Sequence, residues 1–341
     1  MVFSTSLSAA TTQPAGDLVS AATAGTKLPH DQAGRLEAAL RSAPNDAEQH
    51  ATLLGLYSLR PADDAGRRLP HVLWTIENRA TDPIAGSGYC RIDPEIDPAG
   101  YAQGRRLWLQ IEAKAPDDLD VLRNASAFMS AEDDVEAERM LAHAAELRPK
   151  EGEWPERLAL VYERRALRQR KSHEDRQKSA WNALGQRQRA YLLTHEASHR
   201  FGIFVEMPRD AVRAGDYLQA KKLAQQALQM STMVRDDPAY GAAVNVANIV
   251  LGRVALNTGD VDSANAYLQA AGQAPASPVL ASIGPDMSLA KELLKRGQRK
   301  TVRDYLDACL RLWPGGATRV RAWIATVDAG ETPDFGTQAL E

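Results

Sequence analysis

Residues 251–271 have the sequence LGRVALNTGDVDSANAYLQAA. Small and apolar residues recur at helical spacing on both sides of Gly259, and glycine readily adopts the left-handed conformation that ends a helix. This pattern predicts two antiparallel helices joined by a tight turn. Their inner faces are expected to consist of Leu251, Gly252, Ala255, Ala264, Leu268 and Ala271.

Related helix pairs flank this stretch, with turn glycines at Gly215 and Gly297. Their distances from Gly259 are 44 and 38 residues, which is longer than the ~34 residues of a standard tetratricopeptide repeat. A degenerate copy spans residues 118–149, where Val121, Ala125 and other small or apolar residues keep the helical spacing. Proline-containing linkers account for the extra length, so a stack of elongated repeats is predicted.

The glycine turns and small inner residues resemble the tetratricopeptide repeat (TPR) family over residues 32–327, and degenerate bacterial TPR proteins in particular. The aromatic positions of the family pattern mostly hold Leu, Val or Met. The resemblance implies an all-α fold, a right-handed superhelical stack of antiparallel helix pairs. It also implies that the first helices line a concave face, and that binding a protein is the default activity.

Composition suggests how the chain is divided. Residues 1–29 are rich in Ser, Thr and Ala and are expected to be a disordered tail, followed by a repeat domain over residues 30–327. Residues 82–100 contain three Gly and three Pro and are expected to be an irregular loop, for which a function stays open. Residues 164–178 form a highly charged segment, expected to be solvated.

The last predicted helix has Val320, Trp323, Ile324 and Val327 on one face. Because a repeat stack needs a cover for its last apolar face, this helix is expected to be a C-terminal cap. Residues 328–341 are expected to be frayed.

Overall composition excludes some classes of protein. Hydrophobic residues make up 44% and charged residues 25%, and the net charge of −3 does not favour a nucleic-acid partner. The sequence has no run of about eighteen apolar residues, so no membrane span is predicted. The first 26 residues lack the basic and apolar segments of a secretory signal, so location stays open between the cytoplasm and export after loss of a signal.

Residues 195–199, HEASH, match the H-E-x-x-H motif of zinc peptidases. That motif needs both histidines on one helical face, with the glutamate beside a metal-bound water. Counting back from Gly215 places residues 194–200 in a turn between repeats, where His195 and His199 would not share a face. We therefore predict no metal, cofactor or catalytic residue, and keep a zinc-dependent hydrolase as the alternative.

Aligning the three late repeats on their turn glycines brings a set of basic residues into register. Basic residues stand six positions before each glycine, and two positions before it in two of the three repeats. In the resembled family these positions face the concave groove, so a basic ladder is expected there. The ladder consists of Arg209, Arg213, Arg253, Asn257, Lys291 and Lys295, and the apolar residues one helical turn earlier, expected to form side-chain pockets, are Val205, Ile249 and Met287.

The leading hypothesis is a non-enzymatic scaffold that binds a protein or peptide, an acidic one among the candidates, in the groove of the C-terminal repeats. The zinc-dependent hydrolase is the alternative from another class. A further alternative is an assembly subunit that associates through an exposed face of the C-terminal helix. The oligomeric state and the partner stay open.

Overall fold

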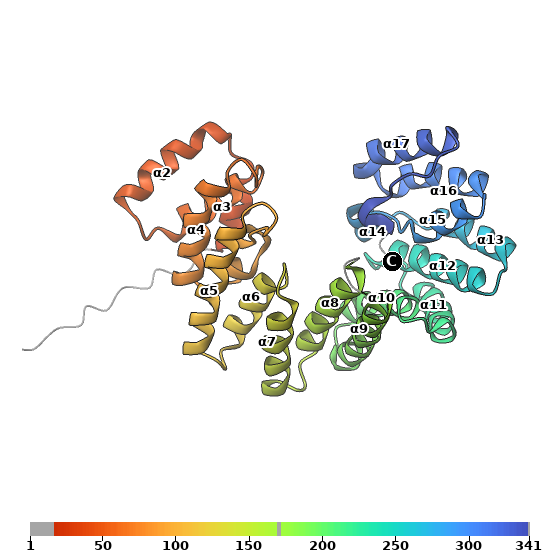
Figure 1. Cartoon of the computed structure of the whole chain (residues 1–341), viewed down its shortest axis with the longest axis horizontal. Coiled ribbons are helices and arrows are strands. Elements are labelled where there is room, and N and C mark those ends of the chain that lie inside the picture. Colours follow the sequence, from red (N-terminus) through yellow and green to blue (C-terminus); the bar gives the residue numbers. More distant parts are fainter. Residues whose placement is uncertain (1–16, 169–171, 340–341) are drawn as a thin grey trace, which may run out of the picture. The chain divides into compact units, whose positions relative to one another are not determined.

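The computed structural model describes residues 17–168 and 172–339, and within these residues all of the regular secondary structure is helical (Figure 1). The described residues form seventeen α-helices and five short 3-10 helices, and they contain no β-strand. The all-α prediction is confirmed for this part of the chain. The described residues divide into two compact units, unit 1 before and unit 2 after the boundary between Leu147 and Arg148.

Unit 1 is a row of helices in which neighbours along the chain pack against each other from α3 onward, while α1 packs on α3. Its helices are α1 (Leu18–Gly25), α2 (Ala33–Ser42), α3 (Ala47–Tyr57), α4 (Ala65–Asn78), α5 (Pro98–Lys114), α6 (Leu119–Met129) and α7 (Asp134–Leu147). Aspartates begin several of them: the side chains of Asp46, Asp97 and Asp118 accept hydrogen bonds from main-chain N–H groups in the first turn.

Helix α1 corrects the expectation of a disordered tail over residues 1–29. Leu18 and Ala22 are buried, and the helix lies so close to α3 that a Cβ added to Gly55 would stand 1.8 Å from the Ala22 carbonyl oxygen. A Cβ on Gly25 would likewise meet the Thr52 carbonyl oxygen at 2.1 Å. The low complexity of the segment concealed this, because small residues here permit close packing rather than disorder. Residues 1–16 lie outside the described part.

Residues 82–100 are more ordered than the predicted irregular loop. They form the 3-10 helices η2 (Pro83–Gly86) and η3 (Gly88–Cys90), and α5 already begins at Pro98. Ile84, Cys90 and Ile92 are buried. The many Gly and Pro residues therefore mark short capped turns, whose apolar side chains anchor the segment to the core of unit 1.

Unit 2 contains the late repeats. Its helices are α8 (Glu153–Leu167), α9 (His173–Leu193), α10 (Ala197–Arg213), α11 (Tyr217–Ser231), α12 (Tyr240–Asn257), α13 (Val261–Gly272), α14 (Pro278–Ile283), α15 (Ser288–Lys295), α16 (Arg299–Leu312) and α17 (Ala317–Asp328). Helix α8 ends and α9 begins inside the charged segment 164–178, most of which is therefore helical. Residues 169–171 within it lie outside the described part.

The three turn glycines have the predicted left-handed conformation, with φ of 78° at Gly215, 82° at Gly259 and 76° at Gly297. The same two main-chain hydrogen bonds close each turn. The glycine N–H donates to the carbonyl oxygen three residues earlier, and the next N–H donates to the carbonyl oxygen five residues earlier, as Asp260 does to Ala255 at 3.0 Å. This is the Schellman pattern. Asp216 and Asp260 then cap the following helices, so the Gly-Asp pair ends one helix and begins the next.

The C-terminal segment is docked rather than frayed over its described residues, 328–339. Phe335 and Ala339 are buried in the core of unit 2, and Phe335 packs edge-on against Trp323 at 5.1 Å between ring centroids. The Trp323 indole N–H donates to the Asp334 carbonyl oxygen at 2.9 Å. These contacts fix the segment on α17. The prediction failed because the segment contributes only a few apolar side chains, too few for a periodic signal.

The docked segment also changes the expectation for α17. Val320, Trp323 and Val327 are buried within unit 2, and Ile324 packs partly against the same core. The face that the assembly hypothesis needs is thus covered by the chain itself. None of the described helices is long and apolar enough to cross a membrane.

Candidate functional site

The expected basic ladder lies on the helices that precede the glycine turns. Arg209 and Arg213 lie on α10, Arg253 on α12 and Lys291 on α15, as the repeat register predicted. Asn257 and Lys295 are exposed at the ends of their helices, and Lys291 is half-buried.

The three apolar candidates do not form open pockets. Val205, Ile249 and Met287 are 2%, 1% and 0% exposed and belong to the hydrophobic core of unit 2. All three side chains lie beneath neighbouring helices, and their burial removes apolar surface from water. These residues therefore do not line a surface that is open to a ligand.

The arginines of the ladder are paired with carboxylates, so the ladder is not a row of free cations. Arg209 donates from Nη1 to Glu206 at 2.8 Å and from Nε to Asp286 at 3.1 Å. Arg213 donates to Glu163 at 2.8 Å. Arg253 donates in the same way to Glu292 at 2.8 Å. The arginines of this face therefore already have carboxylate partners. The face is not the purely basic ladder that the sequence predicted.

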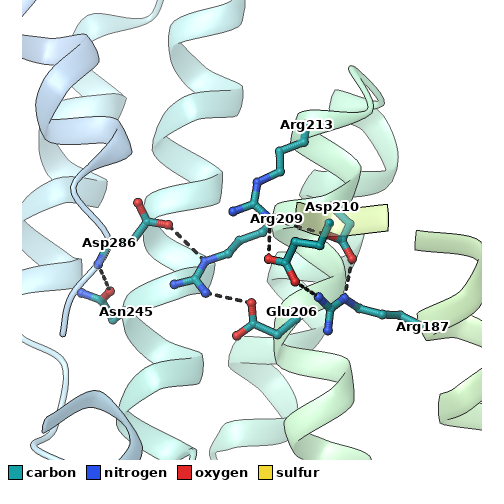
Figure 2. A network of polar contacts seen from close by, with 8 residues as sticks. Arg187, Glu206, Arg209, Asp210, Arg213, Asn245 and Asp286 are labelled. Carbon is teal, nitrogen blue, oxygen red and sulfur yellow. Dashed lines mark hydrogen bonds and ion pairs between the residues drawn. The ribbon is translucent and has the colours of Figure 1, made fainter. Parts of the chain in front are cut away.

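Arg187 on α9, which the sequence reasoning missed, holds the network together from behind. It is 4% exposed and donates through Nε to Asp210 at 2.5 Å and through Nη2 to Glu163 (Figure 2). Glu163 thereby receives Arg187 on one oxygen and Arg213 on the other. A signal was available: Arg187 is four residues after Ala183 and three before Ala190, which places a charge on the buried face of α9.

Two carboxylates of this network have pKa values shifted in opposite directions. Burial opposes ionisation of Glu163, but Arg213 and Arg187 lower its pKa to about 2. Burial raises the pKa of Asp210 to about 6, and the nearby Glu163 carboxylate acts in the same direction, while Arg187 and Arg213 oppose the rise. The Oδ1 atom of Asp210 is buried without a hydrogen-bond partner and lies 3.6 Å from Nη1 of Arg213.

A polar recess of about 210 Å³ opens beside the network. Its walls come from α8, α10, the segment before α15 and the docked C-terminal segment; they consist of Glu163, Leu167, Arg209, Arg213, Ile283, Gly284, Asp286, Thr337 and Gln338. Asp210 is not among them. The recess therefore offers ion-paired donors and acceptors to a ligand, while the carboxyl group with the raised pKa stays behind the wall.

The C-terminal segment is held at this recess by one main-chain and one side-chain hydrogen bond. The Met287 N–H donates to the Gln338 carbonyl oxygen at 2.8 Å, and the Gln338 side-chain amide donates to the Ile283 carbonyl oxygen at 3.1 Å. Tyr305 donates to the carbonyl oxygen of Asp286 at 2.9 Å, which fixes the backbone of the recess wall.

The HEASH motif lies at the turn between α9 and α10, as the repeat register predicted. His195 precedes the helix, and Glu196 is its N-cap, accepting hydrogen bonds from the N–H groups of Ser198 and His199. His199 pairs with Glu156 at 2.8 Å. The two histidines do not share a helical face, and among the described residues no group of three or more His, Cys, Asp or Glu is arranged to hold a metal ion.

The sequence matches no protein-family model, and no curated protein is similar to it at a significant level.

Proposed function

We propose that unit 2 is a TPR-like binding module that holds a segment of a protein or peptide partner along α8, α10, α12 and α15. The observation that carries the proposal is the recess at Arg209 and Arg213. It is lined by ion-paired side chains from several helices, and a stretch of polypeptide, Thr337 and Gln338, already forms part of its wall and is held there by the hydrogen bond from the Met287 N–H to the Gln338 carbonyl oxygen. A partner segment would use the same kind of contact.

The packing of the helices supports this proposal. Helix α8 contacts α10, α10 contacts α12, and α12 contacts α15, so the helices that precede the turns are neighbours although other helices separate them in sequence. Helices α10, α12 and α15 each end in the same turn, at Gly215, Gly259 and Gly297, so the chain leaves all three helices with the same backbone geometry. In a TPR-like stack they would form one continuous face.

The contacts also define the chemistry of the ligand. The hydrogen bonds of Arg209 use two of its five N–H donors, and that of Arg213 uses one. The remaining donors can bind carbonyl or carboxylate oxygens of a partner, while Glu163 and Asp286 can accept from its N–H groups. We infer a partner segment with polar groups of both kinds, in which an acidic residue is one of several contacts.

Site-specific photocrosslinking in the native cell tests the proposal. A photoreactive amino acid replaces Thr337, which is exposed and lines the recess, or Lys300, which is exposed on α16 and serves as the control. We expect a polypeptide to be captured from position 337 and not from position 300. We also expect the yield to fall at least severalfold with Arg209→Gln.

Equal capture at both positions, or none at 337, would contradict the proposal. A product with twice the mass of the chain would instead support assembly of copies.

A further inference from the structure

Unit 1 contains a cavity that no part of the proposed peptide-binding function uses. Its volume is about 330 Å³, within the range of small-molecule sites. It lies between α4 and the segment 88–97. Most of its wall is apolar and consists of Pro61, Ala65, Leu69, Val72, Ile92 and Ile96.

Arg68 brings a buried positive charge to this cavity. Its side chain lines the wall, and the residue is only 8% exposed. Its Nη2 atom donates to the carbonyl oxygens of Tyr89 at 2.6 Å and Arg91 at 2.7 Å, and more weakly to that of Gly88 at 3.4 Å. These bonds position the guanidinium but leave its charge uncompensated.

Among the described residues the hydrogen bonds of the Arg68 side chain go to carbonyl oxygens and none goes to a carboxylate, although most buried charges in proteins have a partner of opposite sign. Its Nε atom is buried without a hydrogen-bond partner. Burial lowers the pKa of Arg68, and the group nevertheless stays protonated at any physiological pH. An anion in the cavity would supply the missing counter-charge.

The other charged residues of the wall restrict the charge of that anion. Asp93 and Asp97 each use one carboxylate oxygen to accept a main-chain N–H, from Glu95 at 2.9 Å and from Gly100 at 2.8 Å. These two carboxylates would repel a second negative charge on the ligand. Arg91 is exposed at the rim. A single carboxylate on an apolar body therefore fits this wall better than a phosphate dianion.

We propose that the cavity between α4 and segment 88–97 binds a small monocarboxylate, with its carboxylate at Arg68 and its apolar body against Leu69, Val72 and Ile92. Because the carbonyl oxygens occupy both hydrogens of Nη2, the ligand's carboxylate would accept hydrogen bonds from the Nη1 N–H groups. Such a ligand would also tie α4 to the segment that supplies the three carbonyl oxygens. The site is independent of the recess in unit 2.

Titration calorimetry on the full chain tests this proposal, with octanoate, octan-1-ol and inorganic phosphate as probes. We expect saturable binding of octanoate that is at least about tenfold tighter than that of octanol, since a hydrogen bond between charged groups is stronger than one to a neutral hydroxyl. Phosphate is expected to bind more weakly than octanoate. Equal affinity for octanol and octanoate, or no saturable binding of octanoate, would overturn the proposal.

Three variants make the test specific. Arg68→Gln keeps a side-chain donor for the carbonyl oxygens but removes the charge, and Ala65→Leu fills part of the cavity while leaving Arg68 in place. Each is expected to weaken octanoate binding at least about tenfold. Arg67→Gln, the control, removes a largely exposed charge outside the wall and is expected to change nothing.

Circular dichroism establishes that each variant is folded. If Arg68→Gln does not fold, the Ala65→Leu variant and the octanoate-to-octanol ratio of the unaltered chain decide. Unchanged octanoate affinity in the folded Arg68→Gln or Ala65→Leu variant would refute the assignment.

Discussion

Two buried arginines, one in each unit, are held in opposite ways. Arg187 in unit 2 is 4% exposed and lies between two carboxylates, whereas Arg68 in unit 1 is 8% exposed and faces only carbonyl oxygens. Carbonyl dipoles position a guanidinium without neutralising it. The comparison shows that burial alone does not define the role of an arginine: a compensated one belongs to the framework, and an uncompensated one can receive an anion.

The largest expected effect comes from removing the compensated charge. Arg187→Met leaves Glu163 and Asp210 buried without their shared cation, so we expect unit 2 to lose about 3–5 kcal/mol of stability. Hydrogen exchange in α9 and α10 with increasing denaturant measures this for the unit itself. The exposed Arg189→Met is the control and is expected to stay within about 0.5 kcal/mol of the unaltered chain. A similar small change in Arg187→Met would show that the network contributes no net stability.

The pH dependence of unit 2 follows from Asp210. Its pKa is raised from 3.8 to about 6 in the folded state, so its favourable contribution is complete below pH 3.8 and is lost as the pH rises toward 6. The loss is on the order of 3 kcal/mol. We expect Asp210→Asn to flatten the stability of unit 2 between pH 4 and 6, and the exposed Asp262→Asn to leave it unchanged. An unaltered slope in Asp210→Asn would assign the dependence to another group.

A smaller effect is expected from the uncompensated arginine. Arg68→Met strands carbonyl oxygens but no carboxylate, so we expect a loss of about 1–3 kcal/mol in unit 1, measured by hydrogen exchange in α4. Arg67→Met is the matched control. A loss as large as that of Arg187→Met would break the comparison, because it would require a charge partner for Arg68.

The smallest expected effect on stability comes from the exposed carboxylate of Glu196. Glu196→Ala removes the N-cap of α10 and is expected to lower the melting temperature slightly, whereas Glu196→Asp keeps a capping carboxylate and should restore most of the loss. Thermal unfolding measures both. If aspartate does not rescue the alanine variant, Glu196 acts through something other than its cap.

The repeat register was predictable because it rests on local chemistry. Gly259 and Asp260 specify a turn through their own backbone preferences, and the same logic placed Arg209 and Arg253 on neighbouring helices. Their partners were not predictable. Asp286 is 77 residues from Arg209 and Glu163 is 50 residues from Arg213, so only the packing of the helices decides that these charges meet.

The cavity in unit 1 was harder to foresee. The composition of residues 82–100 indicated irregular backbone, but that Gly88, Tyr89 and Arg91 turn their carbonyl oxygens toward Arg68 depends on how the segment anchors. In the same way, the docking of Phe335 depends on one aromatic contact with Trp323, which leaves no periodic trace.

The chain has two cysteines, and each unit buries one of them, Cys90 in unit 1 and Cys309 in unit 2. Burial raises the pKa of Cys90 to about 12 and that of Cys309 further, so neither thiol reacts until its surroundings open. The rate at which a thiol reagent modifies each cysteine therefore reports how often the unit around that cysteine opens. Because Cys90 lies within η3, beside the cavity wall, bound octanoate should slow the modification of Cys90. The modification rate of Cys309 should stay the same.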